Sequence, residues 1–238
     1  PLSNPIPEKI ATGEIGYGFN YRTLSVMLNG YYTQWMDKSV TKAIGSWNGP
    51  RACIPNIDAR HMGIELEASY QPLEWLRVYG FFTIGNWRWT NDVNFTLFNE
   101  QNEKIGEYHA YIKNLHVGNA PQTSAMLGLS CMPVSGLTLG VDFNYYGRHY
   151  ADFAAADRTD EKDRAEAWKL PDYSTVDLNL NYDFKMGTFR GQLFGNVNNL
   201  FNRKYISDAL DGSDHTRETA VVWYGFGITW TAGLRISF

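Results

Sequence analysis

Hydrophobic and polar residues alternate along the last segment of this sequence, residues 228–238. Side chains of a β-strand point alternately to its two faces, so the segment predicts a strand with one hydrophobic and one polar face. The hydrophobic face carries Trp230, Ala232, Leu234, Ile236 and Phe238. An exposed edge strand of this kind would invite pairing with other chains. In a closed membrane barrel it has two neighbours, and lipid covers its hydrophobic face. The pattern therefore favours a membrane β-barrel.

The same alternation appears in other segments, which we predict to be strands: residues 9–20, 23–36, 60–70, 75–89, 122–132, 137–150, 174–184 and 189–199. Short turns and long loops alternate between them. The predicted loops are residues 39–58, 90–120, 151–173 and 200–227, the second with its own hairpin around residues 93–98 and 108–112. Outer-membrane barrels combine short periplasmic turns with long outer loops. The sequence thus predicts an all-β fold, an antiparallel up-and-down transmembrane β-barrel.

Aromatic residues make up 15% of the chain and gather at the ends of the predicted strands. At the end with the short turns lie Tyr17, Phe19, Tyr70, Trp75, Tyr182, Phe184, Phe189 and Phe238. At the end with the long loops lie Tyr32, Trp35, Trp87, Trp89, Tyr145, Tyr150, Trp223 and Trp230. Aromatic rings prefer the two membrane–water interfaces, so a membrane barrel is expected to carry two such belts.

Composition and charge exclude several other classes of protein. No run of about 18 hydrophobic residues exists, so a helical membrane span is excluded. The mean hydropathy of −0.37 does not argue against a barrel, whose strands alternate hydrophobic with polar residues. The net charge of −4 gives no reason to expect nucleic acid as a partner. Cys53 and Cys131 do not make a disulfide framework. The chain begins at Pro1 without a signal peptide, so we expect that processing or truncation has removed an N-terminal part.

The sequence predicts no metal site and no catalytic set. The histidines lack metal-ligand spacing; they are His61, His109, His116, His149 and His215. Asp208, Asp211 and Asp214 miss the calcium-loop pattern and are interpreted as a solvated turn. The mixed-charge run 157–164 is interpreted as an exposed loop. No Ser/His/Asp set or pair of acid and base carboxylates can be assembled. We therefore expect neither an enzyme nor a cofactor.

Several stretches resemble the C-terminal half of a TonB-dependent outer-membrane receptor. The most specific are residues 196–202 (NVNNLFN), followed by Tyr205, and the terminal residues 233–238 (GLRISF). Further similar stretches are residues 7–9, 63–67, 117–123, 144–147 and 168–171. The resemblance implies a barrel of about 22 strands closed by an N-terminal plug domain. Residues 1–238 would then be one C-terminal part that supplies about nine strands, and the plug, the TonB-binding segment and the first strands would lie outside it.

The resemblance also implies a function and a set of partners. The implied function is that of a receptor in the outer membrane of a Gram-negative bacterium. Such a receptor imports a scarce bulky nutrient, such as an iron chelate, cobalamin or oligosaccharide, with energy coupled through TonB. The implied partners are the rest of the barrel and its plug, TonB, outer-membrane lipid and the barrel-assembly machinery; a surface lipoprotein is a further candidate. Trp230, Leu234, Ile236 and Phe238 would form the assembly signal. A passive porin, a surface adhesin barrel and, less favoured, an outer-membrane barrel hydrolase remain alternatives.

Two groups of residues are candidates for function. The polar strand faces, which would line the lumen and hold the plug, carry Glu65, Glu67, Arg77, Asp142, Asp177, Asp183, Arg190, Asn196, Asn198 and Arg235. The simpler interpretation of each is that a water-filled barrel is polar inside. Loops on a rigid scaffold commonly carry binding residues. The loop candidates for substrate binding are Trp47, Arg51, Trp87, Trp89, His116, Tyr150, Asp152 and Phe153. Each of these also fits a role in a belt or in loop packing.

Overall fold

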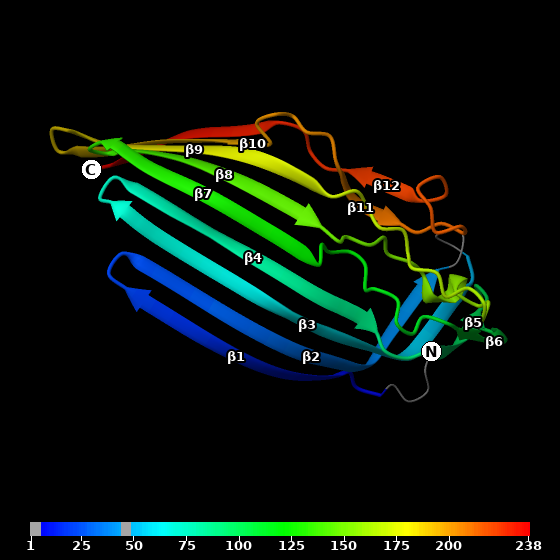
Figure 1. The fold of residues 1–238 in the computed structure, drawn as a ribbon. Helices are drawn as coiled ribbons and strands as arrows, with labels where there is room; N and C mark the ends of the chain where they lie inside the picture. Colours follow the sequence, from blue (N-terminus) through cyan, green and yellow to red (C-terminus); the bar gives the residue numbers. More distant parts are fainter. Residues whose placement is uncertain (1–5, 44–48) are drawn as a thin grey trace.

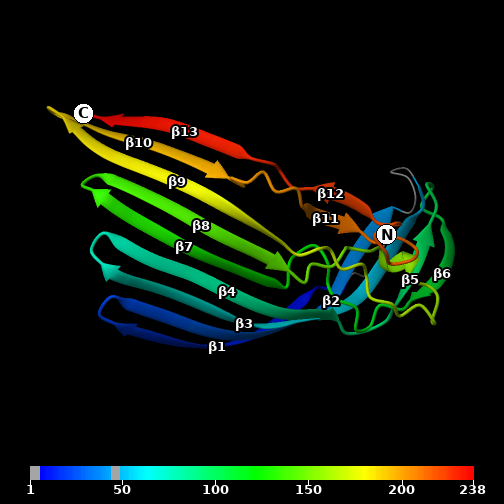
Figure 2. The same cartoon turned by 45° about the horizontal axis from the view of Figure 1, so that its top comes forward.

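Long antiparallel strands follow one another in a curved sheet, in the order β1-β2-β3-β4-β7-β8-β9-β10-β13. The computed structural model describes residues 6–43 and 49–238. The sheet resembles part of a barrel wall, with β1 and β13 at its two edges (Figures 1 and 2). The strands are β1 (Lys9–Tyr21), β2 (Leu24–Ala43), β3 (Arg51–Leu73), β4 (Leu76–Trp89), β7 (Thr123–Val134), β8 (Leu137–Gly147), β9 (Tyr173–Met186), β10 (Phe189–Asn198) and β13 (Thr229–Ser237). The predicted strands and their antiparallel order are confirmed.

Turns and long connections lie at opposite ends of the sheet. The turns are residues 22–23, 74–75, 135–136 and 187–188. Gly136 and Gly187 adopt φ angles of +84° and +62°, a region that glycine enters without steric cost. The C-terminus lies at the end that carries the turns, and the long connections lie at the other end (Figure 1). The predicted asymmetry is confirmed, although the turns are shorter than the sequence indicated.

The two faces of the sheet differ in chemistry as the alternation predicts. Leu139, Leu178 and Leu234 lie on the hydrophobic face, with exposed fractions of 40%, 36% and 58%. On the polar face the Tyr79 hydroxyl of β4 donates a hydrogen bond of 2.7 Å to Asp142 of β8, although β7 lies between these strands. Side chains converge in this way on the concave side of a curved sheet. The polar face is therefore the inner face, and the hydrophobic face is the outer face.

Residues 39–58 are not the long loop that the sequence predicted. β2 continues to Ala43 and β3 begins at Arg51. The register of this hairpin shifts on both sides of Lys38, and Asp37 and Asn56 adopt φ angles of +59° and +58°. Bulges of this kind change which face the following side chains occupy. The alternation is therefore lost in the sequence while the strands remain paired, and the end of the hairpin bends away from the rest of the sheet (Figure 2).

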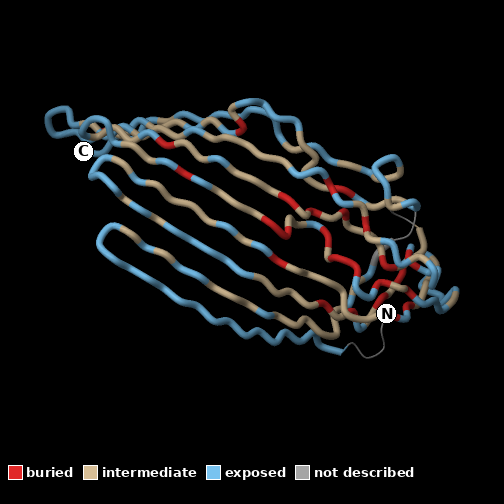
Figure 3. Tube along the Cα trace, viewed as in Figure 1, coloured by how far each residue is buried: buried red, intermediate tan, exposed pale blue. Residues whose placement is uncertain are grey.

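The buried core lies at the end of the sheet that carries the long connections, and it is built from these connections and from the first residues of β3 (Figure 3). Its larger cluster contains Ala52, Ile54, Ile57, Val93, Phe95, Ala110, Ile112, Leu115 and Ala155. A smaller cluster contains Ala151, Leu170 and Ala209. Connections 90–122, 148–172 and 199–228 contribute to these clusters, and we call them together the loop cap. Across the residues that the structure describes, no helix is long and apolar enough to cross a membrane.

The loop cap has secondary structure of its own. It contains β5 (Val93–Phe98), β6 (Lys104–Ala110), the short 3₁₀ helix η1 (Ala155–Asp157), β11 (Ile206–Leu210) and β12 (Val221–Tyr224). The hairpin predicted around residues 93–98 is confirmed, but its second strand begins at Lys104 rather than near residue 108. The β11–β12 hairpin falls in a segment that the sequence predicted to be a loop, because each of its strands is too short to show a period.

Candidate functional site

Aromatic side chains cover the inner face near the end that carries the loop cap. Trp87 on β4 donates a hydrogen bond of 2.8 Å from its indole nitrogen to the Tyr31 hydroxyl on β2. The two rings meet across Gly63 on β3, where a Cβ atom would lie 2.6 Å from the Tyr31 hydroxyl. His61, also on β3, contacts Trp87 with their ring centroids 5.6 Å apart. Because Gly63 has no side chain, Tyr31 on β2 and Trp87 on β4 can contact each other across β3.

A second aromatic row lies one step closer to the loop cap. Trp35 and Trp89 flank Ala59, to which both are paired by register. The Trp35 ring has the Lys38 ammonium 4.2 Å from its centroid, and its indole nitrogen donates to Glu8 over 3.1 Å. We call Tyr31, Trp35, Trp87 and Trp89 the inner aromatic wall. The prediction that Trp35, Trp87 and Trp89 belong to a lipid-facing belt is wrong, because the register places them on the inner face.

A cavity of about 290 Å³ opens between this wall and the loop cap. It brings together three of the predicted binding residues, Trp89, Asp152 and Phe153, with Lys38. Its remaining walls are mostly hydrophobic: Val40, Ile54, Ile57, Ile112, Val117 and Ala155. Such a lining of apolar and aromatic groups with a few polar ones is typical of small-molecule sites.

His116 and Tyr150, two more predicted binding residues, pack against each other within the loop cap. Their rings are stacked with centroids 3.9 Å apart and an angle of 8° between planes. His116 is buried and its imidazole contacts the Glu166 carboxylate, which also accepts the backbone N–H of His116 over 3.0 Å. Burial lowers the pKa of the His116 imidazole, and Arg88 lowers it further, against the opposing charge of Glu166. The neutral ring is thereby favoured as a packing group.

The connection 148–172 is held to connection 90–122 by a bidentate ion pair. Both terminal nitrogens of Arg164 donate to the Asp92 carboxylate, over 2.8 and 2.9 Å. Partial burial would raise the pKa of the Asp92 carboxyl, but the hydrogen bonds and charge of Arg164 outweigh it and lower that pKa. The guanidinium of Arg164 also lies 4.8 Å from the centre of the Tyr111 ring.

A buried charge network holds connection 148–172 to connection 199–228. Arg158 is 2% exposed and donates to Asp211 over 2.7 Å. His215 contacts the same Asp211 oxygen over 2.6 Å and Asp163 over 3.0 Å. Phe153 lies beneath the Arg158 guanidinium, 4.9 Å from it to the ring centre. The prediction of an exposed loop at 157–164 is confirmed for most of this run but is wrong for Arg158, which is buried. The prediction of a solvated turn is wrong for Asp211, whose side chain is 2% exposed. The two charges lie 53 residues apart in the sequence and are brought together only by the fold.

The remaining loop candidates lie apart from the cavity. Arg51 is exposed at the start of β3, where its backbone pairs with Ala43 and Phe98. Trp47 lies outside the described residues. Within the described part of the chain, no group of three or more His, Cys, Asp or Glu side chains is arranged to hold a metal ion.

The predicted lumen residues all fall on the inner face by register. Asp142 accepts from Tyr79 and, over 3.2 Å, from Asn179. Asp177 lies directly opposite and accepts from Asn144 over 2.9 Å. Arg77 donates to Ser69 over 2.8 Å. Longer contacts of 3.3–3.4 Å link Glu65 to Asn29, Asn198 to Thr229 and Arg235 to Gln192. Among the described residues, the side chains of Glu67, Asp183, Arg190 and Asn196 form no such bond. The inner face therefore keeps unpaired charge of both signs.

The sequence and the fold of this chain are similar to those of known proteins. Residues 3–200 match the family model described as TonB dependent receptor-like, beta-barrel. The ferrichrome outer membrane transporter/phage receptor of Escherichia coli (strain K12) is 32% identical over 80 residues, which cover 33% of this chain and 9% of that protein. Among solved structures, the copper transporter OprC has a TM-score of 0.66 at 18% identity, with 98% of this chain and 32% of that chain covered.

The unliganded ferric citrate transporter FecA has a TM-score of 0.63 at 16% identity, with 97% of this chain and 32% of that chain covered. At such identities the likeness of both structures is one of fold. The chain thus spans about a third of the length of these two structures. The relatives are transporters and receptors rather than enzymes, and they are outer-membrane proteins.

Proposed function

This chain belongs to the TonB-dependent receptor β-barrel family, and we propose that its described residues form nine membrane strands from the C-terminal part of a receptor that actively imports a scarce bulky nutrient. The observation that carries the proposal is the open nine-strand wall, with a hydrophobic outer face and a polar inner face. An open wall needs further strands to close, because an unpaired strand edge is not tolerated in lipid. The rest of the barrel is therefore the first partner, in the outer membrane of a Gram-negative bacterium.

The inner face is proposed to hold the plug domain, through which TonB would supply energy. Glu67, Asp183 and Arg190 support this, because their charges have no partner within the described chain. A docked plug domain would provide counter-charges for them. Trp230, Leu234, Ile236 and Phe238 are the proposed assembly signal, and they are exposed on the outer face with fractions of 76%, 58%, 56% and 100%.

The inner aromatic wall and the adjoining cavity are the proposed contact surface for the nutrient. Relatives named for ferrichrome and ferric citrate make an iron chelate the first candidate. Aromatic faces bind the apolar parts of such a ligand, and the Lys38 ammonium attracts its anionic oxygens. His116, Tyr150 and Phe153 would then support the wall from the loop cap.

Uptake in cells that produce the complete receptor tests this function. Radioactive iron bound to a panel of chelates is offered to cells with and without TonB. We expect at least one chelate to be accumulated only when TonB is present. Accumulation that continues unchanged without TonB would support the passive porin and contradict the proposal.

Replacing Trp89 with Ala is expected to weaken binding of that chelate to cells about tenfold to a hundredfold. Truncating an aromatic anchor of a binding site commonly costs about 2 kcal/mol or more. The matched control is Trp75→Ala, at the turn between β3 and β4 at the opposite end of the sheet. Equal binding by both variants at equal amounts of folded receptor would remove Trp89 from the site.

A further inference from the structure

One imidazole in the loop cap lies between carboxylates from two different connections. The Nδ1 atom of His215 lies 2.6 Å from Asp211, in its own connection 199–228. Its Nε2 atom lies 3.0 Å from Asp163, in connection 148–172. The side chain of His215 is 12% exposed, and those of Asp211 and Asp163 are 2% and 29% exposed. Both ring nitrogens therefore face a carboxylate in a site that solvent reaches only in part.

The number of protons on the ring decides how many of these contacts are hydrogen bonds. An ionised carboxylate only accepts, and a neutral imidazole has one N–H, whereas an imidazolium has two. The imidazolium form of His215 can therefore donate to Asp211 and Asp163 at the same time. The neutral ring can keep its bond to Asp211, and its bare Nε2 can accept from Arg158, which lies 3.0 Å away. It can no longer donate to Asp163.

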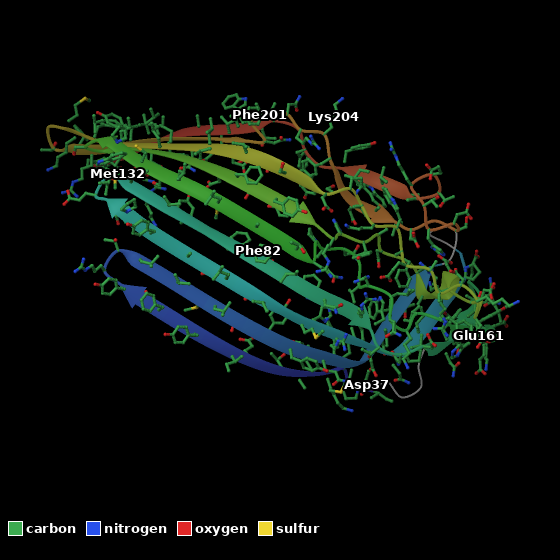
Figure 4. The ribbon with its side chains drawn as sticks, viewed as in Figure 1. Asp37, Phe82, Met132, Glu161, Phe201 and Lys204 are labelled. Carbon is green, nitrogen blue, oxygen red and sulfur yellow. The ribbon has the colours of Figure 1, made fainter. Side chains whose placement is uncertain are left out.

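The charges around the ring favour the second proton. Asp163 and Asp211 carry two negative charges, and Arg158 supplies one permanent positive charge. Only protonation of His215 makes this set of four groups neutral, and an excess charge in a half-buried site is costly. The other charged side chains of segments 157–163 and 211–218 are exposed, and Glu161 lies at the end of the molecule that carries the loop cap (Figure 4).

The segment that His215 contacts also forms part of the cavity wall. The Arg158 guanidinium covers the Phe153 ring, 4.9 Å from its centre, and Phe153 lines the cavity. The carbonyl oxygen of Arg158 accepts the backbone N–H of Tyr111 in connection 90–122 over 2.7 Å. A change in the contact between His215 and Asp163 can therefore reach the cavity through a single buried side chain.

We propose that His215 is a proton-controlled latch of the loop cap, which bridges connections 148–172 and 199–228 when it is protonated and releases Asp163 when it is neutral. On release the proton leaves Nε2 for solvent, while the bonds of Asp211 to Nδ1 and to Arg158 remain. The effect of the latch on the cavity wall rests on the proposed function, but the latch itself does not.

The latch is expected to hold at mildly acidic pH. The bridge made by the imidazolium is present below the ordinary titration range of histidine, about pH 6.5, and is lost as the pH rises through that range. Partial burial would raise the pKa of the Asp163 carboxyl, but the hydrogen bond from His215 and the charge of Arg158 outweigh it and lower that pKa. The contribution of Asp163 is therefore present above the usual carboxyl range, about pH 4, and is lost only in stronger acid.

Hydrogen–deuterium exchange on the complete receptor without nutrient, at pH 5.5 and pH 8.5, tests the proposal. Protection factors, which already allow for the intrinsic pH dependence of exchange, are compared for the amides of residues 160–165 and 212–216. In the unaltered receptor they should fall about tenfold between the two pH values, the effect of losing one hydrogen bond to a charged group.

His215→Asn should remove this pH dependence by lowering protection at pH 5.5 alone. Asparagine tolerates the φ of +55° at this position and can still donate to Asp211, but it carries no charge. Asp163→Asn should also remove the dependence, because an amide can donate to the bare Nε2 of the neutral ring and so keeps the bridge at pH 8.5. The matched control is His109→Asn, at an exposed histidine of connection 90–122, which should behave like the unaltered receptor.

Two results would overturn the proposal: protection in the unaltered receptor that does not depend on pH, or the same pH dependence in His215→Asn as in the unaltered receptor. Failed nutrient uptake by a receptor whose loop cap shows the expected pH dependence would instead count against the proposed function alone.

Discussion

Replacing Arg158 with Ala is expected to destabilise the loop cap by about 3–5 kcal/mol, because it leaves Asp211 and Asp163 without their shared cation. Asp211 is 2% exposed in its side chain, so solvent cannot take the place of the guanidinium. The substitution also removes the cation that covers the Phe153 ring. Connections 148–172 and 199–228 should then separate while the membrane strands stay folded.

Hydrogen–deuterium exchange on the complete receptor measures this effect. Amides of residues 206–224 and 163–168 should exchange at least a hundredfold faster in the variant, and those of β8 and β9 should not change. Arg217→Ala, at an exposed position in the same connection, is the matched control and should exchange like the unaltered protein. Protection that is the same in all three proteins would show that the network does not hold the loop cap together.

Replacing Leu178 with Arg is expected to destabilise the membrane-inserted barrel by about 2–4 kcal/mol, the usual cost of a cation near the midplane on a lipid-facing strand. Leu178 lies near the middle of β9, paired with Val141 and Val197. The matched control is Asn181→Arg on the inner face of the same strand, where a water-filled lumen solvates the charge. Its cost should be below about 1 kcal/mol.

Denaturant titration of the complete receptor refolded into phospholipid vesicles gives both values. We expect Leu178→Arg to lose clearly more stability than Asn181→Arg. Equal destabilisation, or a larger loss for Asn181→Arg, would mean that the faces of β9 have been assigned the wrong way round.

Alternation with a period of two was enough to predict the membrane strands. The method works because the outer face of each strand has one uniform apolar environment. Every second residue on that face is therefore hydrophobic, as Leu139, Val141 and Phe143 are on β8. The order of the strands follows as well. Short turns force four pairs of strands to be neighbours, and across the longer connections elements that are consecutive in sequence also usually lie side by side. The polar inner face could be predicted for the same reason, down to Asp142 and Asp177.

The bent hairpin and the loop cap could not be predicted in this way. Asp37 and Asn56 change the phase of the alternation, so a local pattern disappears while the backbone pairing continues. The contact between Arg158 and Asp211 joins residues that are distant in sequence, and a charge run by itself indicates a solvated loop. The need for glycine at position 63 depends on the side chain of Tyr31 on the neighbouring strand. The need for glycine at position 128 of β7 likewise depends on Tyr79, whose ring a Cβ atom there would meet at 2.4 Å.

The central claim is that the hydrophobic face of this sheet contacts lipid and the polar face lines a lumen. Spin labels placed singly at residues 138–144 of β8, in the complete receptor with Cys53 and Cys131 replaced by Ser, test it directly. In lipid vesicles, labels at 139, 141 and 143 should be relaxed by oxygen, and labels at 138, 140, 142 and 144 should be relaxed by a water-soluble nickel chelate. The opposite alternation, or none, would contradict the account.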